Sequence, residues 1–166
     1  DRSVLAACRD AMEKWVNAMQ AAANELPQGV EDSPENENQH YLINTGFHFG
    51  DWLVPSVKNE AGFSDGPASS FLTMNVVDTA LLTADADMLA EVLELLGESE
   101  KAKEYRDYAR KVRRAFCEEL CTEDGKLKQE MQGNYILALK YHMVPQEMEA
   151  GFAARLAEMI VENEYK

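Results

Sequence analysis

The sequence contains no long apolar run and no recognisable leader. None of its apolar stretches approaches the ~20 residues of a membrane-spanning helix, so no membrane span is predicted. No basic-then-apolar segment opens the chain, so no signal peptide is visible. The chain begins inside a helical pattern and stops at Glu164-Tyr165-Lys166 without a finishing turn. We therefore expect a segment of one domain, residues 1–166, that is incomplete at both ends. The compartment stays undetermined, with the cytoplasm favoured over a secreted or periplasmic location.

Positive charge is scarce. The 166 residues include 16 Lys and Arg against 30 Asp and Glu, which gives a formal net charge of −14. Binding to nucleic acid or to an anionic membrane needs clustered Lys and Arg. We therefore predict no nucleic-acid partner and no membrane partner. The negative charge does not argue against neutral small molecules, such as sugars, as ligands.

Cysteine is scarce too. The three residues, Cys8, Cys117 and Cys121, are an odd number, and no second motif completes a metal-binding pattern with them. Cys117 and Cys121 are one helical turn apart and so share a face. We interpret them as buried, reduced thiols, expect no disulfide framework, and predict neither a metal nor another cofactor.

No convincing strand pattern occurs, whereas apolar residues recur at steps of three and four, as in amphipathic helices. The first of these stripes places Trp15 in the core. Gly97 leaves a one-residue break between two long patterns, which favours an antiparallel hairpin. The sequence predicts an all-α fold of consecutive antiparallel hairpins, the repeating unit of an α/α toroid and of a helical solenoid. The predicted helices span residues 3–25, 71–96, 98–121, 132–143 and 147–163.

Two irregular connections interrupt the helical patterns. Residues 27–44 are polar and are expected to form a solvated surface loop. Residues 56–70 are rich in Gly, Ser and Pro; Asp65-Gly66-Pro67 signals a turn, and Ser69 or Ser70 can cap the following helix. Binding residues concentrate on loops that a rigid scaffold holds, so the stretch between these connections becomes the candidate site.

That stretch, Thr45-Gly-Phe-His-Phe-Gly-Asp-Trp-Leu-Val-Pro55, has no helical period. It combines aromatic rings, a carboxylate and two glycines, which let a backbone come close to another group. A sugar has matching features, because its hydroxyls need acceptors and its C–H faces pack on aromatic rings. The alternative is a buried aromatic turn, since aromatic clusters usually belong to a core.

The stretch Phe47-His48-Phe49-Gly50-Asp51-Trp52-Leu53-Val54-Pro55 resembles a segment of the bacterial α-L-rhamnosidases, glycoside hydrolase family 78. The resemblance continues in order to the end of the chain, through weaker pieces. The chain departs from the family pattern at Gly133, where threonine is usual, and at Leu81, where an aromatic residue is usual. The weaker pieces are Leu95 to Tyr105, Thr122 to Leu127, Gln132 to Leu139 and Met143-Val144-Pro145.

The resemblance implies an arc of an (α/α)6 toroid, the six-hairpin glycosidase fold, in an enzyme that removes terminal α-L-rhamnose from rhamnosides. The family is similar to other inverting glycosidases in using two carboxyl groups, one as acid and one to activate water. Its general acid belongs to an arginine-containing acidic motif upstream of the matched stretch, and its general base lies well downstream. No residue of this chain is therefore assigned a catalytic role, and we expect the segment alone to be inactive.

What the resemblance carries over is a binding face at the open mouth of the toroid. It implies that Asp51 accepts hydrogen bonds from sugar hydroxyls and that Trp52 packs on the sugar ring or on the floor beneath it. His48 is a further predicted substrate contact, and Gln132, at a helix start, could also face the mouth. Each has a structural alternative: backbone N–H groups satisfying Asp51, a core anchor for Trp52, and a packed histidine for His48.

Two other functions stay open. One is a helical-repeat scaffold that binds another protein, although no second copy occurs at the ~34-residue offset that a tetratricopeptide array needs. The other is an α/α-toroid glycosidase with a different sugar specificity, because fold alone does not determine substrate. An arc cut from a ring exposes apolar helix faces, so we also expect the isolated segment to self-associate through them.

Overall fold

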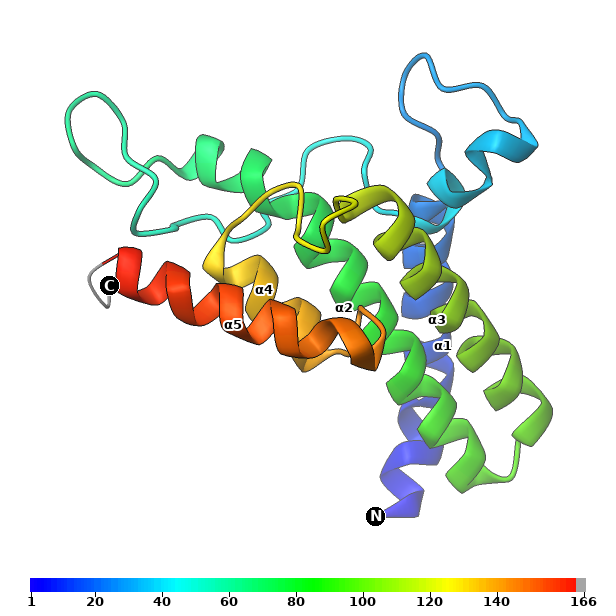
Figure 1. The fold of residues 1–166 in the computed structure, drawn as a ribbon. Coiled ribbons are helices and arrows are strands. Elements are labelled where there is room, and N and C mark those ends of the chain that lie inside the picture. Colours follow the sequence, from blue (N-terminus) through cyan, green and yellow to red (C-terminus); the bar gives the residue numbers. More distant parts are fainter. Residues whose placement is uncertain (164–166) are drawn as a thin grey trace.

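The computed structural model describes residues 1–163 and is helical (Figure 1). The described part contains no β-strand, only isolated bridges of Lys58 with Ser64 and of Cys121 with Leu127. The predicted all-α class is therefore confirmed. No helix among the described residues is long and apolar enough to cross a membrane. The elements are α1 (Arg2–Ala23), the 3-10 helix η1 (Pro34–Tyr41), α2 (Gly66–Leu96), α3 (Ser99–Leu120), α4 (Gln132–Lys140) and α5 (Gln146–Glu162).

Helix α2 is the centre of the assembly, because it contacts α1, α3 and α4, and α4 in turn pairs with α5 (Figure 1). Its N-terminus is capped by Asp65, whose carboxylate accepts the backbone N–H of Ala68 at 3.0 Å. Its C-terminus is Gly97, which adopts the left-handed conformation with φ 90°. Because only glycine takes this conformation without a Cβ penalty, the hairpin of α2 and α3 begins where the sequence predicts it.

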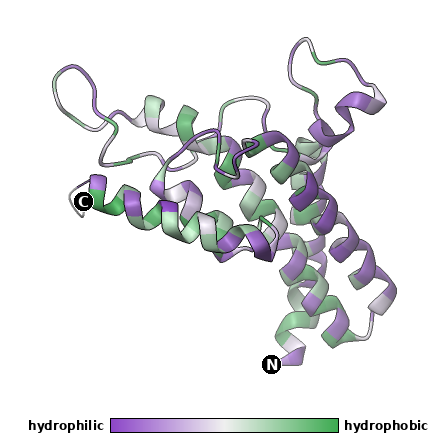
Figure 2. Ribbon diagram, viewed as in Figure 1, coloured by the Kyte–Doolittle hydropathy of each residue, from purple (hydrophilic) through white to green (hydrophobic). Residues whose placement is uncertain are grey.

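Two groups of buried side chains hold the helices together. One joins α2 and α3 to α4 and α5 around Phe116, Tyr135 and Phe152, all fully buried. The rings of Tyr135 and Phe152 meet edge to face with centroids 5.0 Å apart. The other group joins α1 to α2 and α3 around Val16 and Leu89. Figure 2 shows α3 as the most hydrophilic of the long helices, as expected of a helix with only one buried face.

The prediction that Trp15 belongs to the core is wrong. Trp15 is 57% exposed, and its indole N–H donates to the carboxylate of Asp85 at 2.7 Å. The buried positions of α1 are Val16 and Ala23. Trp15 lies about 100° around the helix from Val16, since 3.6 residues make one turn, and this places it beside the buried stripe.

The prediction of a structureless loop over residues 27–44 is also wrong in part. Pro34–Tyr41 form the 3-10 helix η1, which packs against α3. The side-chain amides of Asn38 and Gln39 donate to the carboxylates of Glu118 and Glu119, at 2.6 and 2.9 Å. Contacts with residues some 80 positions later therefore order a segment whose composition is that of a loop.

The start of α2 differs from the prediction as well. The Asp65-Gly66-Pro67 signal is not a separate turn but the cap and first positions of the helix, where proline is well tolerated because the first N–H groups have no partner. Ser69 and Ser70, expected as possible caps, are fully buried inside the helix. Their hydroxyls serve the candidate site.

Candidate functional site

The non-helical stretch 47–55 lies against the first turns of α2 and is held there by buried hydroxyls. The backbone N–H of Asp51 donates to Oγ1 of Thr73 at 2.8 Å, and that of Val54 donates to Oγ of Ser69 at 3.3 Å. The hydroxyl of Ser70 donates to the carbonyl of His48. Such bonds satisfy backbone groups that a loop cannot pair by itself. The N-terminal part of α2 is thus the rigid support of the candidate site.

Gly50 brings this stretch into contact with α2. It has φ 54°, and a Cβ built on it would lie 2.6 Å from Oγ1 of Thr73 and 2.7 Å from the backbone nitrogen of Met74. Both the conformation and the close approach therefore require glycine. The position of the next residue, Asp51, depends on this approach.

Asp51 is exposed, and within residues 1–163 its hydrogen bonds run through its backbone and not through its carboxylate. Its side chain lines a cavity of about 1070 Å³ between the 51–58 segment and the ends of α4 and α5. Gln132 and Gly133, at the start of α4, line the same cavity. The cavity therefore joins residues some 80 positions apart.

Two other carboxylates, Glu130 and Glu162, line the cavity, but both are paired. Arg155 donates to Glu130 at 2.8 and 3.4 Å and to Glu162 at 3.1 Å. The Tyr135 hydroxyl also donates to Glu130, at 3.0 Å. Arg155 first, and Tyr135 as well, hold the pKa of the Glu130 carboxyl below its ordinary value. Among the described carboxylates of the cavity, Asp51 alone is left for a ligand.

Trp52 does not line this cavity. Its indole covers Gly66, where a Cβ would lie 2.6 Å from one ring carbon, and it remains 36% exposed. It meets Phe47 and Phe49 edge to face, with ring centroids 6.2 and 5.3 Å away. The three rings form an exposed cluster, so they are not the buried aromatic turn of the alternative interpretation.

His48 does not line the cavity either, and both its ring nitrogens face protein atoms. Nε2 lies 2.8 Å from the carbonyl oxygen of Thr45, and Nδ1 lies 3.8 Å from the carboxylate of Asp78. Burial raises the pKa of Asp78 above its ordinary value, and the neighbouring His48 partly opposes this. The structure thus brings Asp51 and Gln132 to one cavity, and leaves Trp52 and His48 outside its lining.

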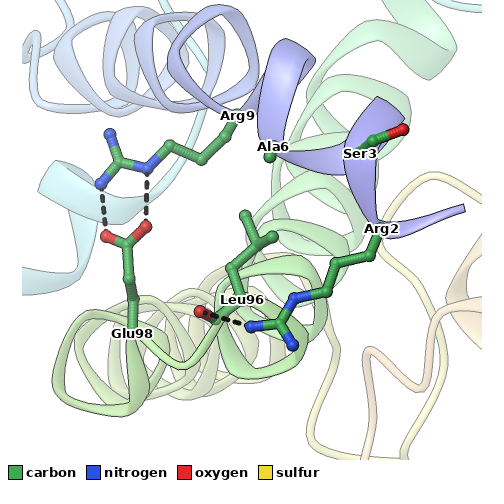
Figure 3. A pocket seen from close by; sticks show the side chains of 6 residues that line it. All are labelled: Arg2, Ser3, Ala6, Arg9, Leu96 and Glu98. Atoms are coloured by element: carbon green, nitrogen blue, oxygen red, sulfur yellow. Dashed lines mark hydrogen bonds and ion pairs between the residues drawn. The ribbon is translucent and has the colours of Figure 1, made fainter.

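A second cavity, of about 520 Å³, lies between the first turns of α1 and the α2–α3 connection (Figure 3). Its charged groups bond to the protein. Arg9 donates to both carboxylate oxygens of Glu98, at 3.1 and 2.6 Å, and Arg2 donates to the carbonyl of Leu96 at 3.2 Å. These bonds fasten the hairpin to α1, so we assign this cavity a structural role.

Groups that could hold a metal are absent from the described residues, where no three His, Cys, Asp or Glu side chains come together. The cysteines are free thiols, but the prediction that they are buried is wrong for Cys8, which is exposed; Cys121 is buried and Cys117 is half-buried. The Cys117 thiol donates to the carbonyl of Met143 at 3.4 Å. We therefore assign Cys117 and Cys121 a role in packing.

Sequence reasoning missed the supporting hydroxyls and most of the cavity. Ser69, Ser70 and Thr73 carry no signal of their own, because a hydroxyl in a helix is usually a cap or a surface residue. Glu130 and Arg155 come to the same cavity as Asp51 only through tertiary structure. Gln132, named only as a residue that could face the mouth from its place at a helix start, lines the cavity.

Comparison with known proteins identifies the family. A family model, the bacterial alpha-L-rhamnosidase 6 hairpin glycosidase domain, matches residues 1–166. An alpha-L-rhamnosidase of Streptomyces avermitilis is 26% identical over 160 residues, which are 96% of this chain and 12% of that protein. This chain thus spans about an eighth of the length of that relative.

Solved structures show the same fold. The native α-L-rhamnosidase of Aspergillus terreus matches with a TM-score of 0.75 and 24% identity, over 100% of this chain and 17% of that one. The Streptomyces avermitilis enzyme, complexed with L-rhamnose, matches with a TM-score of 0.72 and 26% identity, over 99% of this chain and 13% of that one. The helical hairpins described above are thus a segment of an (α/α)6 toroid, and the chain belongs to the bacterial α-L-rhamnosidase six-hairpin glycosidase family.

Proposed function

We propose that this chain is part of the catalytic domain of an inverting α-L-rhamnosidase and supplies one wall of its sugar pocket. The observation that carries the proposal is Asp51: an exposed carboxylate, unpaired among residues 1–163, on a rigidly held stretch and facing a cavity. A relative of the same family has been crystallised with L-rhamnose, which supports a rhamnose-containing ligand.

The proposed reaction needs two further carboxyl groups, about 6.5–9.5 Å apart in inverting enzymes. One donates its proton to the glycosidic oxygen as the bond to the sugar breaks. The other takes a proton from the water that attacks the opposite face of the ring. The family pattern places both outside residues 1–166, so this chain by itself should not hydrolyse a rhamnoside.

In this proposal Asp51 accepts hydrogen bonds from the hydroxyls of the terminal rhamnose. Each hydrogen bond to a charged group contributes about 1.5–3 kcal/mol. The contact of Trp52 with Gly66, outside the lining of the cavity, favours a supporting role for Trp52 over direct stacking on the sugar ring. The partners of both His48 nitrogens favour a supporting role, and its predicted sugar contact stays a prediction that His48→Gln would test.

The test is Asp51→Ala in the full-length polypeptide that carries this chain, with Glu123→Ala as the control. Glu123 is exposed on the turn after α3 and lines no part of the Asp51 cavity. Asp51→Ala should weaken L-rhamnose binding, measured by calorimetry, by at least about tenfold. The rate of hydrolysis of a chromogenic rhamnoside should fall strongly, whereas the Tm should change little. Equal loss of activity and stability would instead favour a structural role for Asp51.

A further inference from the structure

Gly133 is the second residue of α4 and lines the cavity beside Asp51. A Cβ built on it would lie 3.2 Å from Oδ2 of Asp51, closer than nine in ten real contacts of a Cβ. Its backbone does not require glycine, because Gly133 is not among the glycines with positive φ. What a side chain would change here is the space beside the carboxylate.

Gly151, in α5, provides the comparison within the same chain. It is also helical, and a Cβ built on it would meet nothing within 4 Å. Glycine weakens a helix relative to most other residues, at either position. Only at Gly133 does the missing side chain leave room next to a candidate ligand contact.

We propose that Gly133 is a specificity-determining residue, which widens the sugar pocket beside Asp51 by the volume of a side chain. The ligands admitted there are L-rhamnose derivatives with one additional small substituent, a hydroxyl or a methyl ether, on the side facing α4. This inference rests on the proposed function, because it needs Asp51 to contact the sugar. The resemblance implies threonine at this position in the family, which makes threonine the side chain to test here.

A side chain at this position should alter the pocket and not the fold. The atom that it would meet is the far end of an exposed aspartate side chain, which can move by a few tenths of an ångström. By contrast, a Cβ on Gly50 would meet the backbone of Met74, which cannot move without moving α2. Binding and stability should therefore respond separately at Gly133.

The experiment compares the full-length wild-type polypeptide with Gly133→Thr and with the matched control Gly151→Thr. Calorimetry measures Kd for L-rhamnose, for its methyl ethers, one for each ring hydroxyl, and for L-mannose, which carries one more hydroxyl. Gly133→Thr should raise the ratio of Kd for at least one derivative to Kd for L-rhamnose by about tenfold or more relative to wild type, the discrimination expected from one added carbon. Gly151→Thr should change none of these ratios, and both variants should have similar Tm values.

Three outcomes separate the inference from the proposed function. If Asp51→Asn leaves L-rhamnose affinity unchanged, the proposed function fails, and the inference fails with it. If Asp51→Asn weakens binding but Gly133→Thr changes all ligands in parallel, the inference alone is overturned. The inference is also overturned if, for every derivative, the ratio of its Kd to that of L-rhamnose is the same in wild type as in Gly133→Thr.

Discussion

The hydroxyl of Thr73 is the contact on which the position of Asp51 most directly depends, and Thr73→Val removes it while conserving shape. Thr73 is fully buried; its Oγ1 accepts the N–H of Asp51 at 2.8 Å and donates to the carbonyl of Ser69 at 2.8 Å. Valine puts a methyl group where the acceptor was. The amide of Asp51 then loses its partner, and the methyl group pushes against it.

Thr83→Val is the matched control. Thr83 is also fully buried in α2, and its hydroxyl donates at 3.0 Å to the carbonyl four residues earlier, that of Thr79, just as Thr73 donates to Ser69. The two substitutions therefore remove the same bond within the helix, and they differ in the bond to the loop. The bond of the Asp51 amide to Thr73 is partly buried, and leaving a buried or partly buried donor unpaired costs about 1–3 kcal/mol. This is a factor of about 5 to 150 in the local opening equilibrium.

Amide hydrogen exchange in the full-length polypeptide measures that equilibrium at residue 51. In Thr73→Val the Asp51 amide should exchange about 5 to 150 times faster than in wild type, and in Thr83→Val at nearly the wild-type rate. L-Rhamnose affinity should fall in the first variant only. If the Asp51 amide exchanged equally fast in both variants, this hydroxyl would not hold the candidate site, and our account of how α2 supports it would be refuted.

Three other predictions concern the backbone at Gly50, the ion pair of Glu130, and the behaviour of the isolated chain. Gly50→Ala should destabilise the protein by about 2 kcal/mol or more in chemical denaturation, because the added methyl group clashes with Met74 and the backbone conformation is unfavourable for alanine. Gly29→Ala is the control: Gly29 also has a positive φ, of 85°, but has open space around it, so this variant should lose less unfolding free energy. Because Arg155 lowers the pKa of Glu130, this carboxylate stabilises the folded state above its ordinary pKa of 4.5, and the contribution is lost as pH falls through its folded value. Glu130→Gln should therefore cost more stability at about pH 6 than at acid pH, and the cost should shrink as pH falls through the lowered pKa of Glu130, measured as unfolding free energies. Finally, the 166-residue chain expressed alone should self-associate in sedimentation velocity, and a clean monomer would contradict that prediction.

Local patterns in the chain were sufficient to predict its class and the α-helices α1 to α5, although not η1 or the first turn of α2. Apolar residues at steps of three and four predict a helix whatever it packs against, and a glycine such as Gly97 ends one through its own backbone conformation. The absence of helical period in residues 45–55 likewise marks the candidate stretch. The family resemblance rests on these same residues, with Phe49-Gly50-Asp51-Trp52 at their centre.

Tertiary structure decided which face of each element is used and which distant residues meet. Trp15 lies at the edge of its apolar stripe, and only the packing of α1 on α2 places it outside the core. Ser69 and Ser70 became anchors of the loop because the stretch lies across them. The approach of Gly133 to Asp51, and the cavity that they share, come from residues 82 positions apart in the chain. Periodicity determines local conformation, but such a meeting depends on how all the helices pack together, and no local pattern contains that information.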